Sequence, residues 1–189
     1  SFDEMAKKVA LFIMAMRKPD ELFYHDWYPD KGIDKELMKL YASPQAIFAL
    51  ARYAKAFDDE KALEMASKGM DYMAGPYWDH FLGSFFFGLE HWTCLAAEEV
   101  YNANPKTEYA KLCLGIGTHY NNITHKLGET PFEEDVGGMS ITHLFTPHVG
   151  GTATAIEAIV SAVILGNAIG EDTTSLREQL KASFGYFIK

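Results

Sequence analysis

The sequence predicts an all-α fold, an array of antiparallel helical hairpins with about seven helices. One pattern occurs three times in the 189 residues: an apolar helix rich in small residues, a short turn, and a more polar helix. A helix that is apolar nearly all round is buried on several sides, whereas a helix with a polar stripe faces water. Each hairpin is therefore expected to pair an inner helix with an outer one.

The expected elements follow the chain in order. Residues 1–18 predict an amphipathic outer helix, and residues 21–32, rich in aromatic and turn residues, predict a short extended excursion. The hairpins then cover 43–73, 89–120 and 151–188. Each outer helix is expected to have its N-cap in the turn before it, and these turns are Asp58-Asp59, Asn104-Pro105 and Gly170-Glu171-Asp172. Pro44, behind Ser43, suits the first turn of a helix.

Composition excludes several classes of protein. A hydrophobic content of 48% is too high for a disordered chain. The net charge of −9, with no basic stretch, makes nucleic acid and anionic membrane surfaces poor partners. The apolar run from Val9 to Met16 is too short to span a bilayer and resembles no signal peptide. Two cysteines are too few for a disulfide framework and suit either redox compartment, so localisation stays open.

Two long connections separate the hairpins. The first, residues 75–88, is rich in aromatic residues, and the second, residues 127–151, holds acidic residues and histidines between glycines. Ordered loops of this length commonly carry function.

Three segments together resemble a known architecture. SPQAIFALARYAKAFDDEKALEMASKGMDYM, ELFYHDWYPDKG and GLEHWTCLAAEEVY are similar to the α-hairpins of the (α/α)-toroid, six-hairpin glycosidase-like superfamily. This group includes glycoside hydrolases, polysaccharide lyases and sugar epimerases. The chain supplies only part of the helices of a full toroid, so the resemblance implies a single α-hairpin domain over 1–189 that is a fragment of a larger toroid, or an open array completed by another chain. It also implies a substrate cleft at one mouth, built by loops that lead into the inner helices.

Candidate acid–base residues lie in these two loops, taken as 75–91 and 127–151. Glycoside hydrolysis needs two carboxylates across the scissile bond, and histidine passes protons near neutral pH. The candidates are Asp79, Glu90, Glu133, Glu134 and Asp135, with His91, His143 and His148 to orient or shuttle protons. In the alternative interpretation Glu90 is an ordinary first-turn acid, His91 packs in the interior and the acidic triplet is a solvated loop.

Candidate sugar-binding residues are mostly aromatic, because flat rings with a polar edge suit the faces of sugars. They are Trp27, Tyr28, Tyr77, Trp78 and Trp92. Phe85, Phe86 and Phe87 are instead expected to fill the core beneath the loops. Alignment of the three hairpins places Gln45, Trp92 and Glu157 at equivalent depth on the inner helices.

Other chemistries find little support. No tight metal-ligand spacing such as HExxH occurs, no phosphate-binding glycine loop is present, and Ser140 lacks the GxSxG context of a nucleophile. No metal and no cofactor are predicted. Two hypotheses remain: a carbohydrate-active domain of hydrolase or lyase type, or at least glycan-binding, with an oligosaccharide or polysaccharide as partner; and a non-catalytic helical-repeat module that binds a protein partner or a second copy of itself.

Overall fold

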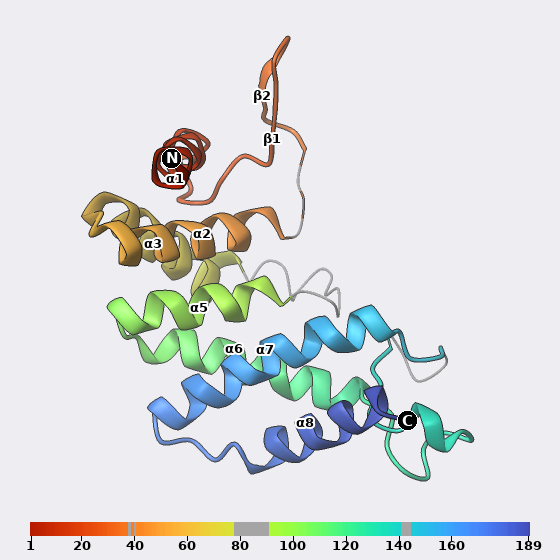
Figure 1. The fold of residues 1–189 in the computed structure, drawn as a ribbon. Coiled ribbons are helices and arrows are strands. Elements are labelled where there is room, and N and C mark those ends of the chain that lie inside the picture. Colours follow the sequence, from red (N-terminus) through yellow and green to blue (C-terminus); the bar gives the residue numbers. More distant parts are fainter. Residues whose placement is uncertain (38, 40, 78–90, 141–144) are drawn as a thin grey trace.

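The computed structural model describes residues 1–37, 39, 41–77, 91–140 and 145–189. Over this part of the chain the protein is all-α, with seven α-helices and one small two-stranded sheet (Figure 1). The predicted fold class is confirmed.

The α-helices occupy the expected segments. They are α1 (Phe2–Ala15), α2 (Ala42–Phe57), α3 (Glu60–Tyr72), α5 (Trp92–Ala103), α6 (Thr107–Ile123), α7 (Val149–Ala168) and α8 (Thr174–Phe187). A π-helical turn, η1 (Met73–Tyr77), continues α3, and a 3-10 turn, η2 (Glu133–Asp135), lies in the second long connection. The predicted extended excursion forms an antiparallel pair, β1 (Asp26–Tyr28) and β2 (Gly32–Asp34).

The helices form two layers. Helices α2, α5 and α7 lie side by side, and α3, α6 and α8 pack behind them as their hairpin partners. All three inner helices begin at the same end of the array, the right-hand end in Figure 1. This shared end is where residues distant in the sequence meet.

Helix starts match the predicted caps only in part. Asp59 caps α3, because its carboxylate accepts a hydrogen bond from the Ala62 N–H at 3.0 Å. In contrast, α6 begins after Lys106 without a side-chain cap, so the N-cap expected at Asn104-Pro105 was wrong. At the third turn the N-cap is Thr173 rather than a residue of 170–172; Asp172 instead accepts from the Thr174 N–H at 2.9 Å.

The sequence predicts that this helix starts behind Ser43, but α2 starts earlier in the chain. The helix begins at Ala42, so Ser43 lies inside its first turn and is buried. Its hydroxyl accepts a hydrogen bond from the Phe23 N–H at 3.3 Å. Ser43 therefore ties the excursion between α1 and α2 to the start of α2, and Pro44 remains in the first turn as predicted.

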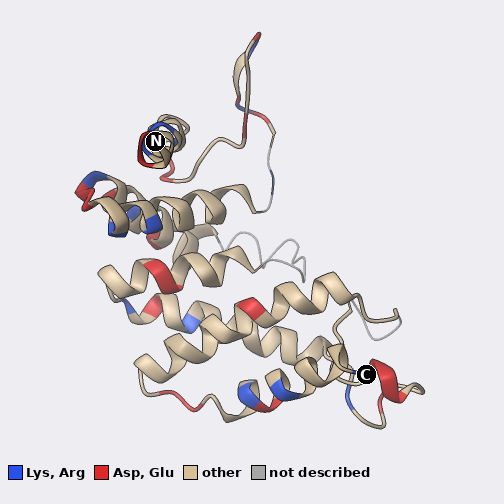
Figure 2. Cartoon of the chain, in the orientation of Figure 1, with Lys and Arg blue, Asp and Glu red and all other residues tan. Residues whose placement is uncertain are grey.

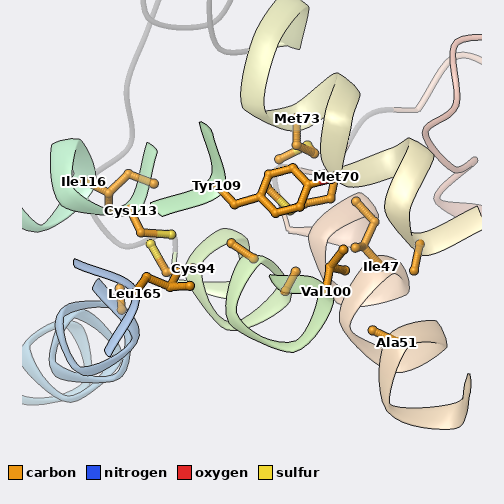
Figure 3. Packing of buried hydrophobic residues seen from close by; sticks show 14 of the residues in the cluster. Ile47, Ala51, Met70, Met73, Cys94, Val100, Tyr109, Cys113, Ile116 and Leu165 are labelled. Carbon is orange, nitrogen blue, oxygen red and sulfur yellow. The ribbon is translucent and has the colours of Figure 1, made fainter. Parts of the chain in front are cut away.

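The core runs along the interface between the two layers. Met70, Met73 and Tyr109 pack together where α3, η1 and α6 meet, next to Val100 of α5 (Figure 3). The Tyr109 hydroxyl donates to Asp71 at 2.6 Å, so this buried ring keeps its polar tip satisfied. Cys94 and Cys113 are buried in the same core.

Among the inner helices, α7 is almost without charged residues along its length (Figure 2). Helix α7 carries one charged residue, Glu157. Its length and composition alone would suit a membrane span, yet 56% of its apolar window is buried within the protein. Because it packs against α5, α6 and α8, its apolar character matches its place as an inner helix.

Candidate functional site

A hollow lies at the shared end of the inner helices and is called here the inner-helix hollow. It has a volume of about 440 Å³ and is lined by Tyr41, Gln45, His91, Trp92, His148, Gly150, Gly151 and Thr154. These residues come from the first two turns of α2, α5 and α7 or immediately precede these helices. Four of them, Gln45, His91, Trp92 and His148, are residues that the sequence predicts as site residues. The structure thus brings together predicted residues up to 103 positions apart, from Gln45 to His148.

His148 is the N-cap residue of α7. Its Nδ1 accepts a hydrogen bond from the Gly151 N–H at 2.9 Å, and its carbonyl accepts from the Thr152 N–H at 2.8 Å. Serine, threonine, aspartate and asparagine are the usual N-caps, and here an imidazole nitrogen takes the same acceptor role. Because Nδ1 accepts, the proton of the neutral ring resides on Nε2.

The second long connection determines where His148 lies. Thr124 and Met139 form an isolated antiparallel bridge, and the Met139 carbonyl accepts from the His148 N–H at 3.0 Å. The Met139 N–H donates to Thr152 Oγ1 at 2.9 Å. Met139 is buried, so both hydrogen bonds are shielded from water. The start of α7 is therefore fixed from both sides of His148.

The Gly137-Gly138 pair allows this connection to pack closely. Gly137 has φ of +92°, and a Cβ there would lie 2.0 Å from the Ala182 carbonyl oxygen of α8. A Cβ on Gly138 would lie 2.5 Å from Pro147 Cβ. Only glycine fits at both positions, one for its backbone conformation and both for the space available.

His91 and Glu157 form the charged pair next to the hollow. His91 Nε2 lies 3.3 Å from Glu157 Oε2; the His91 side chain is 11% exposed and that of Glu157 is 56% exposed. Glu157 lies about two turns into α7, beside the start of α5, and is not itself among the lining residues. A carboxylate that contacts an imidazole can hold the ring in one orientation.

Trp92 and Gln45 add an aromatic ring and an amide. Trp92 is half-buried; its ring packs against Phe48 with a centroid distance of 5.8 Å and against His91 at 4.9 Å. Gln45 is exposed on α2 and offers both donors and an acceptor. Together with the ring of Tyr41 and the hydroxyl of Thr154, these groups combine flat apolar surfaces with several hydrogen-bonding atoms.

Other predicted residues lie elsewhere. Trp27 and Tyr28 are on β1, in the hairpin that projects away from the helices, and Trp27 packs edge-on against Phe12 of α1. Tyr77 ends η1 and packs against the core.

The carboxylates of Glu133, Glu134 and Asp135 are on η2 near the C-terminus, where Lys189 Nζ donates to the Glu133 carbonyl. None of these six residues lines the inner-helix hollow, so their roles stay predictions.

Four predicted residues fall outside the described part of the chain. These are Trp78, Asp79, Glu90 and His143. The phenylalanines Phe85, Phe86 and Phe87 lie in the same gap.

The described residues contain no group of three or more His, Cys, Asp or Glu side chains that could hold a metal ion. A separate hollow of about 510 Å³ lies at the opposite end of the inner helices, lined among others by Asp58, Asp59, Glu60 and Glu99. It contains none of the predicted site residues.

Sequence reasoning missed Tyr41 and Thr154 as lining residues. Both are recognisable only from helix starts, because Tyr41 is the residue before α2 and Thr154 lies one turn after the start of α7. Thr154 donates its hydroxyl proton to the Gly151 carbonyl at 3.0 Å, which leaves its oxygen lone pairs as acceptors.

Comparisons with known proteins add no relative. No protein-family model, no curated protein sequence and no solved structure matches the chain significantly. The functional argument therefore depends on the chemistry of the inner-helix hollow.

Proposed function

We propose that this chain binds glycans at the inner-helix hollow, as part of a carbohydrate-active (α/α)-toroid domain. The observation that carries the proposal is the convergence of Gln45, Trp92 and His148 on one open hollow at the common start of three inner helices. An aromatic ring can stack on the apolar face of a sugar, while the amide and imidazole groups bond to its hydroxyls. The rings of Tyr41 and Trp92 provide two such surfaces.

The proposed chemistry at this hollow is general acid–base catalysis by His91 and Glu157. Their 3.3 Å contact supports the transfer and storage of one proton beside a bound sugar. One carboxylate with one histidine suits proton abstraction, as in lyase or epimerase chemistry. A hydrolase of the two-carboxylate type would need a second acid, for which Asp79 and Glu90 are the sequence candidates.

A binding assay tests the proposal. The chain is titrated calorimetrically with neutral and acidic oligosaccharides, and the best ligand is then measured with Gln45→Ala. Because the exposed Gln45 amide would lose its hydrogen bonds to the sugar, affinity is expected to fall about 3- to 10-fold. Lys55→Ala is the matched control, since Lys55 is exposed on the same helix at its other end. Binding to no saccharide, or equal losses in both variants, would contradict the proposal.

A second candidate function is a non-catalytic interaction module, and the surface of α1 favours it. Phe2, Met5, Val9 and Phe12 repeat at helical spacing, and their exposed fractions range from 49% to 90%. This set is called here the α1 stripe. Trp27, 47% exposed, extends it through its edge-on contact with Phe12. Contiguous exposed apolar surface of this kind commonly marks a protein interface.

A further inference from the structure

The inner-helix hollow is poor in positive charge. None of its described lining residues is Lys or Arg. The carboxylate of Glu157 contributes negative charge beside His91. Recognition of a sugar carboxylate normally uses an Arg or Lys side chain, because a charge-assisted pair offsets the loss of hydration.

His148 fixes the direction of one hydrogen bond in this hollow. The Gly151 N–H occupies its Nδ1, so the neutral ring presents Nε2–H as a donor. His148 is exposed, and the bridge through Met139 holds its backbone in place. A ring held in this way donates to an oxygen atom and cannot use Nδ1 to accept a proton without losing the cap of α7.

We propose that the hollow selects an uncharged saccharide, and that His148 binds one oxygen of that sugar through its Nε2–H while its Nδ1 caps α7. This inference rests on the proposed glycan-binding function and deepens it. Sugar hydroxyl and ring oxygens accept such a hydrogen bond without any charge to be neutralised. The two nitrogens of one ring therefore have separate tasks, one structural and one in recognition.

Matched ligands test the choice of substrate class. Tri- to hexasaccharides of glucose, galactose, mannose and xylose are titrated against oligosaccharides of the corresponding uronic acids. The expected result is an affinity for one neutral series at least about tenfold higher than for its uronate counterpart. Equal or tighter binding of a uronate overturns the inference and leaves the glycan proposal standing. Binding of neither class overturns the glycan proposal, and this inference falls with it.

Two variants separate the tasks of His148. His148→Asp keeps an N-cap acceptor for the Gly151 N–H but has no side-chain donor, so thermal stability should stay near that of the wild type while affinity for the neutral sugar falls about 3- to 10-fold. His148→Ala removes both groups and should lower stability as well as affinity. Undiminished affinity in His148→Asp would overturn the donor role.

The tautomer can be read without any ligand. Long-range proton–nitrogen NMR correlations of the free protein near neutral pH should show His148 protonated on Nε2 and unprotonated on Nδ1. The opposite tautomer would overturn the inference independently of any glycan.

Discussion

Single residues couple the fold of this protein to pH. Burial lowers the pKa of His25 below its usual value, and the nearby Lys18 acts in the same direction. Burial also lowers the pKa of His119. His25 contacts Ser43, with its Nε2 3.4 Å from Ser43 Oγ, and its Nδ1 accepts from the Lys39 N–H. The neutral ring thus helps to hold the β1–β2 excursion at the start of α2.

These two pKa shifts predict acid sensitivity. Because both pKa values are lower in the folded protein, the unfolded chain binds more protons below its ordinary histidine pKa of about 6.5. The stability that the neutral rings contribute is complete above that value, and the free energy of unfolding should fall as the pH drops below it. Urea unfolding at a series of pH values from about 7.5 to about 5 measures how steeply the free energy of unfolding depends on pH.

Substitutions of the two histidines show how much each contributes to the pH dependence of the free energy of unfolding. His25→Gln should reduce the pH dependence, and His119→Gln should remove a further part, with roughly additive effects if the two sites are independent. An unchanged slope in the double variant would contradict this explanation of the acid sensitivity.

At the scale of elements, small residues set how closely the helices approach. A Cβ on Gly166 of α7 would lie 2.7 Å from Thr173 Cγ2 and 2.8 Å from Leu114 Cδ2 of α6. Gly115 of α6 has no heavy atom within 4 Å of the same position. The two glycines therefore make a matched pair, one in a helix contact and one facing open space.

Alanine at these glycines should change stability in opposite directions. Gly166→Ala is expected to cost about 1–3 kcal/mol, because the added methyl group overpacks the contact between α6 and α7. Gly115→Ala is expected to stabilise by about 0.5–1 kcal/mol through its higher helix propensity. Chemical unfolding of the two variants measures both changes in the free energy of unfolding. A change in the same direction for both variants would contradict the explanation that close packing at Gly166 makes its substitution destabilising.

Helix positions could be predicted from sequence because the evidence for them is local. The apolar spacing of the segments around Ile47, Cys94 and Ile159 indicates buried inner helices, and all three residues are fully buried. The turn residues correctly predict the N-cap at Asp59. They do not predict the N-cap at the second turn, because the chain stays extended from Asn104 through Lys106 before α6 begins. Cap geometry depends on backbone conformation that composition alone does not determine.

The candidate site was predictable only in part. Gln45 and Trp92 could be selected because the alignment of the hairpins places them on the inner helices, and His91 and His148 because they lie in the loops that lead into these helices. The contact of His91 with Glu157 depends on how far α7 extends past α5, which is a tertiary offset. The same limit applies to η2, since nothing in the sequence of residues 133–135 indicates that they lie beside the C-terminus.

For the whole molecule, the α1 stripe predicts self-association if the interaction function holds. Light scattering over a range of concentrations should show oligomers that the Met5→Lys/Val9→Lys variant no longer forms, with little change in its unfolding midpoint, since both side chains are exposed. Leu11→Lys is the matched control: Leu11 is 55% exposed on α1 but does not share the spacing of the stripe. A monomer at every concentration would remove self-association as a role of this surface.

NMR mapping with a bound neutral oligosaccharide tests most directly whether the inner-helix hollow is the binding site. Isotope-labelled protein is titrated, and the side-chain signals of Gln45, Trp92 and His148 are followed together with those of Trp27 on the β1–β2 hairpin. The account predicts saturable changes at Gln45, Trp92 and His148, with Trp27 unaffected. Changes confined to Trp27, or to residues outside the hollow such as Glu133 and Glu134, would contradict it.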